Sequence, residues 1–146
     1  MKTIRLSKTF TFESAHALDG YDGKCKNIHG HSYQLIVTVK GQPIEDETHV
    51  KQGMLIDFSE LKSIVKKHII KDFDHALILK HDSRFRGIEN KAQKTVYTPY
   101  QPTCENMVID FARILKEVLP ENVTLHSLLL RETGNSYAEW FMEDNM

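Results

Sequence analysis

The sequence predicts an α+β fold with the element order strand, strand, helix, helix, strand, strand. Three observations favour this order. Two segments in the first third of the chain alternate apolar and polar residues, which is the period of a strand with one buried face. Two later segments space their apolar residues three and four positions apart, as an amphipathic helix does. Two apolar runs near the C-terminus complete the pattern, and we expect both to be strands.

The two N-terminal strands are predicted over residues 4–16 and 31–41. Residues 4–16 alternate loosely, with one parity holding Ile4, Leu6, Phe10, Phe12 and His16. The second alternates in the same way at His31, Tyr33, Leu35, Val37 and Val39. Because side chains alternate across a strand, His29 and His31 project on the same side if the second strand starts early enough. The end of the first strand and the start of the second then meet as antiparallel neighbours.

The two helices are predicted from their caps and stripes. Asp57 can serve as the first N-cap, with Glu60 three residues later in a capping-box-like pattern. The stripe behind it is Leu61, Ile64, Val65, His68 and Ile69. Thr103 is the expected N-cap of the second helix, which ends at Pro120. Its stripe is Val108, Phe111, Leu115, Val118 and Leu119.

The remaining segments are a loop and two strands. Residues 80–102 show no clear period and include a glycine and two prolines, so we expect a long, irregular excursion. Residues 123–131 are apolar enough for a strand. A last strand is expected over residues 135–141, after a turn at 133–135.

Composition narrows the class of protein. The 146 residues, 40% hydrophobic and 27% charged, are typical of one globular domain, which we expect to span residues 1–146. Nineteen basic residues nearly balance twenty acidic ones, and no basic tract predicts nucleic-acid binding. No apolar run has the length of a membrane span, and the N-terminus lacks a signal-peptide pattern. A cytoplasmic location is therefore expected, with both cysteines as free thiols.

Three histidines and one cysteine lie close together in the sequence. His16, His29 and His31 can supply three neutral nitrogen ligands, and a catalytic zinc needs such a set with one position open. Imidazole also suits other divalent ions. Cys25 lies between basic neighbours that favour the reactive thiolate, so it is a candidate nucleophile or base. It could instead be a fourth zinc ligand or a small buried loop residue, whereas Cys104 is expected to serve packing.

Other polar residues carry weaker signals. Asp74 beside His75 could orient and activate the imidazole, although such a pair is more often a surface feature at a helix end. Glu132 ends an apolar strand, where a carboxylate is usually solvated but could accept paired N–H donors from an amino-pyrimidinone ring. Thr103 and Glu105 most simply begin a helix, and backbone N–H groups there can also meet a ligand.

Six short motifs occur in one order along residues 12–133: Phe12-Glu-Ser-Ala-His16, Cys25-x-x-x-His29-Gly-His31, Asp57-Phe58-x-Glu60-Leu61, Asp74-His75, Pro102-Thr103-x-Glu105-Asn106 and Glu132-Thr133. Together they resemble the 6-pyruvoyl-tetrahydropterin synthase / 6-carboxytetrahydropterin synthase family. The resemblance covers essentially the whole chain, and the cysteine–histidine motif with its upstream histidine is the most specific part. It implies the tunnelling fold, a four-stranded antiparallel sheet with two helices on one face in the order ββααββ.

The resemblance also implies roles for individual residues. In a family member, His16, His29 and His31 would bind Zn²⁺. Cys25 would be the catalytic thiol, and Asp74 and His75 would complete a proton-transfer group. Glu132 would anchor the pterin ring, with Thr103 and Glu105 lining the same pocket. Family members form trimers whose sheets close into a barrel, usually paired as hexamers, so a homo-oligomer is expected. Residues 80–101 look longer than in compact members.

The resemblance implies a lyase acting on 7,8-dihydroneopterin triphosphate. The short N-terminus and the ending Glu132-Thr-Gly-Asn-Ser-Tyr-Ala-Glu-Trp140 favour the 6-carboxy branch, which releases triphosphate and acetaldehyde on the path to queuosine. The alternative is the 6-pyruvoyl branch, which keeps the three-carbon side chain. A non-catalytic zinc- or pterin-binding module is a third reading, because a fold alone does not fix a function.

Overall fold

A long antiparallel hairpin organises the structure, a computed structural model that describes residues 2–146. Strand β1 (Ile4–His16) pairs with β2 (His29–Gly41) along its whole length. The register places His16 opposite His29. From Phe10 onward, the even-numbered residues of β1 are buried, as are the odd-numbered residues Tyr33 to Val39 of β2. Both predicted strands are confirmed, the second starting early enough to include His29.

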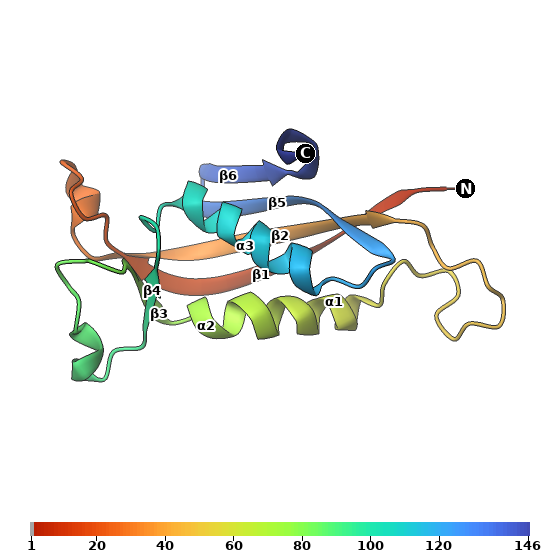
Figure 1. Ribbon diagram of the computed structural model, residues 1–146, viewed down its shortest axis with the longest axis horizontal. Coiled ribbons are helices and arrows are strands. Elements are labelled where there is room, and N and C mark those ends of the chain that lie inside the picture. The colour runs from red at the N-terminus through yellow and green to blue at the C-terminus, as the bar shows by residue number, and fades with distance from the viewer. Residues whose placement is uncertain (1) are drawn as a thin grey trace.

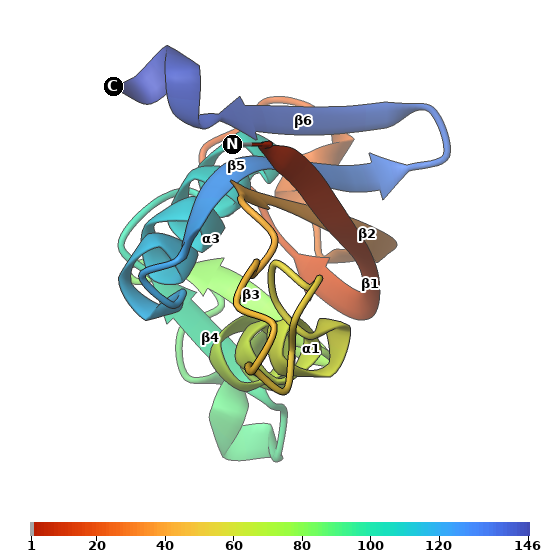
Figure 2. The ribbon, with the colours of Figure 1, turned by 90° about the vertical axis from the view of Figure 1, so that its right-hand side faces the viewer.

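The hairpin belongs to a six-stranded mixed sheet in the order β4-β3-β1-β2-β5-β6. Strands β5 (Val123–Thr133) and β6 (Ser136–Phe141) continue the antiparallel pairing beyond β2. Strands β3 (Ala76–Lys80) and β4 (Thr95–Thr98) are parallel, and β3 pairs with β1 only over residues 14–16. The sheet curls around the helices (Figures 1 and 2).

The prediction of a four-stranded antiparallel sheet in the order ββααββ is wrong, because β3 and β4 lie between the two helices in the sequence. The first four residues of β3, Ala76 to Leu79, are all buried, so the strand shows no alternation of apolar and polar residues. Strand β4 has only four residues within a mostly polar segment. Such short strands are ordered by their neighbours in the sheet, and a local sequence period does not report them.

The helices begin where their caps predict. The Asp57 carboxylate accepts the Ser59 N–H at 2.8 Å and starts α1 (Phe58–Val65). This helix continues through a π-helical turn (Lys66–Ile70) into α2 (Lys71–Phe73). The Thr103 hydroxyl accepts the Asn106 N–H at 3.1 Å and starts α3 (Cys104–Val118). Short 3-10 turns occupy Lys24–Lys26, Ile88–Lys91 and Met142–Asn145.

Both helices pack on the concave face of the sheet, which confirms the α+β class (Figure 2). The shared core joins Phe12 and Tyr33 of the hairpin to Leu61 of α1 and Phe111 of α3. Phe12 stacks on Tyr33 with ring centroids 4.9 Å apart. Close packing of this kind fixes rotamers. The buried Tyr33 ring therefore gives a rigid wall to the His31 imidazole, whose centroid is 5.5 Å away.

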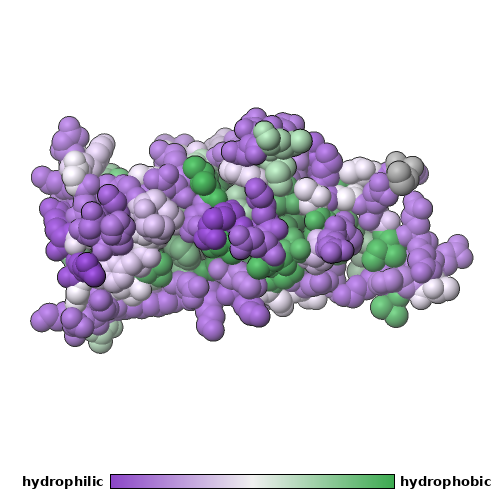
Figure 3. Space-filling view, viewed as in Figure 1, coloured by the Kyte–Doolittle hydropathy of each residue, from purple (hydrophilic) through white to green (hydrophobic). Residues whose placement is uncertain are grey.

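A smaller apolar cluster lies at the end of the molecule where β1 ends and β2 begins. Its buried members are Ala17, Leu77 and Leu79, and Phe85 and Ile88 pack against it. The loops of this end lie at the left of Figure 1, where the surface in Figure 3 is mostly hydrophilic. No helix among residues 2–146 is long and apolar enough to cross a membrane.

Candidate metal centre

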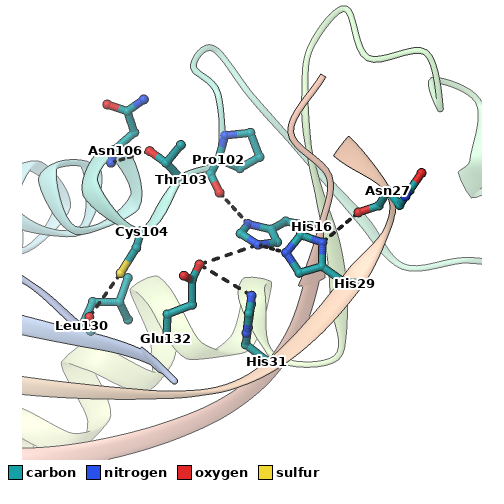
Figure 4. Close-up of polar contacts among 10 residues, drawn as sticks. All are labelled: His16, Asn27, His29, His31, Pro102, Thr103, Cys104, Asn106, Leu130 and Glu132. Carbon is teal, nitrogen blue, oxygen red and sulfur yellow. Dashed lines mark hydrogen bonds and ion pairs between the residues drawn. The ribbon is translucent and has the colours of Figure 1, made fainter. Parts of the chain in front are cut away.

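Three imidazoles converge at the ends of β1 and β2 (Figure 4). One nitrogen each from His16, His29 and His31 lies within 4.8 Å of the other two. The strands explain this grouping, because His16 faces His29 across the ladder and His31 is two residues further along the same face. The alternating pattern that predicts the strands therefore also assembles a three-nitrogen site.

Backbone carbonyl groups orient two of the rings. His16 Nδ1 lies 2.7 Å from the Pro102 carbonyl oxygen, and His29 Nδ1 lies 2.7 Å from that of Asn27. A carbonyl only accepts, so each Nδ1 is the protonated donor and each Nε2 carries a free lone pair. Metal-binding histidines are commonly held by this kind of outer contact.

The donor set fits a cation. His16 Nε2 and His29 Nε2 face each other at 2.9 Å although both are acceptors in this tautomer, and His31 Nε2 is buried without a hydrogen-bond partner in the described part of the chain. Burial lowers the pKa of His16 to about 4, with the neighbouring His29 and His31 acting in the same direction against the Pro102 contact. The imidazole is therefore neutral at neutral pH, which is the form that binds a metal. Lone pairs meeting in a buried space repel unless a cation lies between them.

Glu132 is also part of this cluster. Its Oε1 lies 3.6 Å from His16 Nε2 and 3.6 Å from His31 Nε2 (Figure 4). A register shift between β5 and β6 occurs at this residue, and Glu132 continues the inward parity of Leu128 and Leu130. Bulges often direct a side chain into a site. The carboxylate gives the centre one negative charge, which opposes the effect of burial on the pKa of His31.

Cys25 lies in the exposed 3-10 turn between β1 and β2, and its thiol is free. Among residues 2–146, the group of possible ligands holds the three imidazoles and not this thiol, so the reading of Cys25 as a fourth ligand gains no support. Cys104, the first residue of α3, is also free but buried, with Sγ 3.2 Å from the Leu130 carbonyl oxygen. Burial raises the pKa of this second thiol to about 12, as befits a packing residue.

The Asp74 carboxylate and the His75 imidazole contact each other beside β1. Asp74 Oδ2 lies 3.1 Å from His75 Nδ1, and Asp74 Oδ1 accepts the Glu13 N–H at 2.9 Å. His75 has a left-handed backbone (φ 59°), which is uncommon outside glycine and is held by its N–H bond to the Glu13 carbonyl. His75 and His31 both line a cavity of about 600 Å³.

The contacts of the Asp74 carboxylate with Glu13 and His75 give a pH-dependent prediction for the variant Asp74→Asn. The Glu13 N–H, and then His75 and Lys94, hold the pKa of Asp74 below its usual range. A carboxylate with a depressed folded-state pKa contributes stability above its unfolded pKa and loses it as the pH falls through the folded one. We expect the variant to unfold at lower urea concentration than the native protein at pH 7. This difference should begin to close as the pH falls below about 4, the ordinary pKa of an aspartate, and disappear below the lowered pKa of folded Asp74. The exposed Asp72→Asn is the control and should show no such difference; a gap that does not shrink as the pH falls below about 4 contradicts the account.

The start of α3 lies beside the cluster. Thr103 caps the helix next to Pro102, whose carbonyl holds His16, whereas Glu105 is exposed in the first turn. A groove of about 810 Å³ between β4 and α3 is larger than the cavity near His75, but none of the predicted site residues line it. The carbonyls of Asn27 and Pro102 were not predicted, since a backbone group leaves no signal in residue identity.

Comparisons with known proteins show the family of this chain. A model of the 6-pyruvoyl tetrahydropterin synthase family matches residues 5–143. The chain belongs to this family. The predicted family is thus confirmed, and so is the prediction that the chain is a lyase of that family.

Relatives and solved structures extend this family match. The chain is 39% identical over 142 residues to a 6-carboxy-5,6,7,8-tetrahydropterin synthase of Haemophilus influenzae, covering 94% of this chain and 98% of that one. It is 36% identical to the Rickettsia typhi protein of the same name, covering 93% and 99%. The 6-pyruvoyl tetrahydropterin synthase structures from Caenorhabditis elegans and Plasmodium vivax share the fold. The Caenorhabditis elegans structure has a TM-score of 0.71 at 22% identity, and the match covers 97% of this chain and 96% of that one. The Plasmodium vivax structure has a TM-score of 0.73 at 21% identity, and the match covers 96% of this chain and 98% of that one.

Proposed function

We propose that this chain is a zinc-dependent 6-carboxy-5,6,7,8-tetrahydropterin synthase. It would convert 7,8-dihydroneopterin triphosphate with loss of triphosphate and acetaldehyde, as a cytoplasmic step towards queuosine. The observation that carries the proposal is the cluster of His16, His29 and His31 with its inward-facing Nε2 atoms, in a chain whose relatives at 36–39% identity bear that enzyme name.

The three imidazoles would hold the zinc ion, and the carbonyls of Pro102 and Asn27 would keep their Nε2 atoms available. A zinc ion in this position supplies Lewis acidity to the hydroxyl groups of the substrate side chain. Glu132 lies within 3.6 Å of two of these nitrogens, so a ring anchored by its carboxylate would have its side chain close to the metal. Thr103 and Glu105 would line the same pocket from the start of α3.

Proton transfer falls to Cys25, Asp74 and His75. The Asp74 carboxylate holds His75 Nδ1, which leaves Nε2 of an exposed ring to accept or return a proton. Cys25, in the 3-10 turn of the loop that joins β1 to β2, would be the second proton-transfer group. A binding module would need neither group, and their joint presence favours an enzyme.

An assembly of identical chains would complete the site. Within residues 2–146, residues 4–13 of β1 pair with no strand on the side away from β2, and β6 forms the opposite edge of the sheet. Unpaired edges invite pairing with another strand, so we propose a trimer or a hexamer closed through these edges. Light scattering that finds three or six chains supports this assembly, and a monomer contradicts it.

Product identification tests the proposed reaction. The zinc-loaded protein is incubated with 7,8-dihydroneopterin triphosphate, and the pterin products are identified by mass spectrometry. A 6-carboxytetrahydropterin with one acetaldehyde per turnover is expected. A 6-pyruvoyl product would replace the proposal with the pyruvoyl branch, and substrate bound without conversion would favour the binding module.

A further inference from the structure

Residues 81–94 belong to the segment 80–101, which looks longer than in compact family members, and they are anchored next to the imidazole cluster. Phe85 and Ile88 pack against Ala17, the residue that follows His16, together with Leu77 and Leu79 of β3. The Gly87 N–H donates to the Tyr97 hydroxyl at 2.9 Å, which ties the segment to β4 as well. Burial of these side chains fixes the backbone around residue 84.

The loop that carries Cys25 (residues 17–28, here the thiol loop) has little burial of its own. Its 3-10 turn contains no buried residue, and most of residues 20–28 are exposed. One internal backbone bond reaches the thiol residue, from the Leu18 N–H to the Cys25 carbonyl at 2.9 Å. A segment with few apolar contacts opens locally at low cost unless other groups hold it.

Arg84 supplies such contacts at two points of the thiol loop. At the first, its backbone N–H donates to Asp19 Oδ1 at 3.3 Å, and its Nε lies 3.6 Å from the same oxygen. At the second, its Nη2 donates to the carbonyl of Lys26, the residue after Cys25. The guanidinium also stacks on Phe85, 4.7 Å from the ring centroid, so it is itself held in place.

Asp19, near the start of the thiol loop, is held by the Arg84 guanidinium. Asp19 has only 19% of its side chain exposed, and its Oδ2 is buried without a hydrogen-bond partner among residues 2–146. Gln101 Nε2 donates to the Asp19 backbone carbonyl at 2.7 Å and leaves that carboxylate untouched. Removing the Arg84 side chain would take away the cation that contacts this carboxylate and leave it the backbone N–H of residue 84.

We propose that Arg84 is a positioning residue, which clamps the thiol loop at Asp19 and Lys26 and so fixes Cys25 relative to the imidazole cluster. The catalytic part of this inference rests on the proposed function, in which Cys25 moves protons. The effect is local, because the Arg84 side chain is half exposed and one such pair adds little to global stability.

Arg84→Ala tests the clamp, with Arg84→Lys as the conservative variant and Arg86→Ala as the matched control from the same segment. Two readouts do not depend on turnover. They are the rate at which iodoacetamide alkylates Cys25, located by peptide mass spectrometry, and the rate at which trypsin cleaves after Lys24 and Lys26. We expect both rates to rise about fivefold in Arg84→Ala, the change in open population that one lost ion pair allows.

Arg84→Lys keeps the charge at Asp19 without the forked reach to Lys26, so its rates should be intermediate. Arg86→Ala should match the native protein, and bound zinc should be unchanged in all three variants. Arg84→Ala rates equal to those of the native protein would overturn the clamp.

In the turnover assay, kcat should fall in Arg84→Ala while KM changes little. An unchanged kcat in a loosened loop would overturn the positioning role. If the native protein makes no product, the proposed function fails, and the two rates still decide the clamp.

Discussion

Replacing Cys25 by alanine is expected to remove most turnover while leaving the metal centre intact. Deleting one general acid or base typically lowers a rate by about 10²- to 10⁴-fold, and we expect kcat of Cys25→Ala to fall in that range. The thiol is outside the group of three imidazoles, so the variant should bind as much zinc as the native protein. Steady-state turnover and elemental analysis of the same preparation measure both quantities.

Cys104→Ala is the matched control for the loss of a thiol. Cys104 is buried, with its Sγ bonded to the Leu130 carbonyl, and its substitution removes packing rather than a proton-transfer group. Turnover should therefore stay close to native after this change. The thiol of Cys25 has no catalytic role if Cys25→Ala turns over as fast as Cys104→Ala. A loss of zinc in Cys25→Ala would instead identify the thiol as a ligand.

The centre of the fold could be predicted because local patterns and tertiary contacts agree there. The alternation in residues 4–16 defines β1 to the residue, and the same parity carries His16 to the buried face. The caps at Asp57 and Thr103 work through contacts within three residues of each helix start. Such helix caps can be predicted from the sequence because their contacts involve no distant residue.

Strands β3 and β4 could not be predicted in this way, since their stabilisation comes from distant parts of the chain. The pairing of β3 with β1 joins Ser14 to Ala76, sixty-two positions apart. The same holds for the outer contacts of the metal centre, where Pro102 is 86 residues from His16. A carbonyl oxygen is present at every residue, so only the folded backbone reveals which one holds an imidazole.

Glu132 could be predicted in part from the local pattern and in part depends on distant contacts. Its place at the end of a strand was predicted, and the inward parity of Leu128 and Leu130 points its carboxylate to the buried face. Its distance of 3.6 Å from two imidazole nitrogens was not predicted, because it depends on the pairing of β5 with β2. The register of the sheet thus brings the Glu132 carboxylate next to imidazoles that are far from it in the sequence.

Replacing His29 by alanine is expected to abolish metal binding and turnover together. The site then keeps two imidazoles, whereas a catalytic zinc site commonly uses three protein ligands. We expect the purified variant to lose its zinc on dialysis, while the native protein keeps about one ion per chain. Adding zinc should raise the melting temperature of the native protein and not that of the variant, since a ligand stabilises only a fold that binds it.

His81→Ala controls for the loss of an imidazole, because His81 is exposed and its described contact is a backbone N–H bond to the Thr98 carbonyl. This variant should retain zinc, the shift in melting temperature and turnover. The melting temperature separates loss of metal from loss of fold. His29→Ala should melt close to the metal-free native protein, because the substitution loses the contact with the Asn27 carbonyl but also relieves the repulsion between facing Nε2 atoms. If His29→Ala binds zinc as tightly as His81→Ala does, the cluster at the ends of β1 and β2 is not a metal centre.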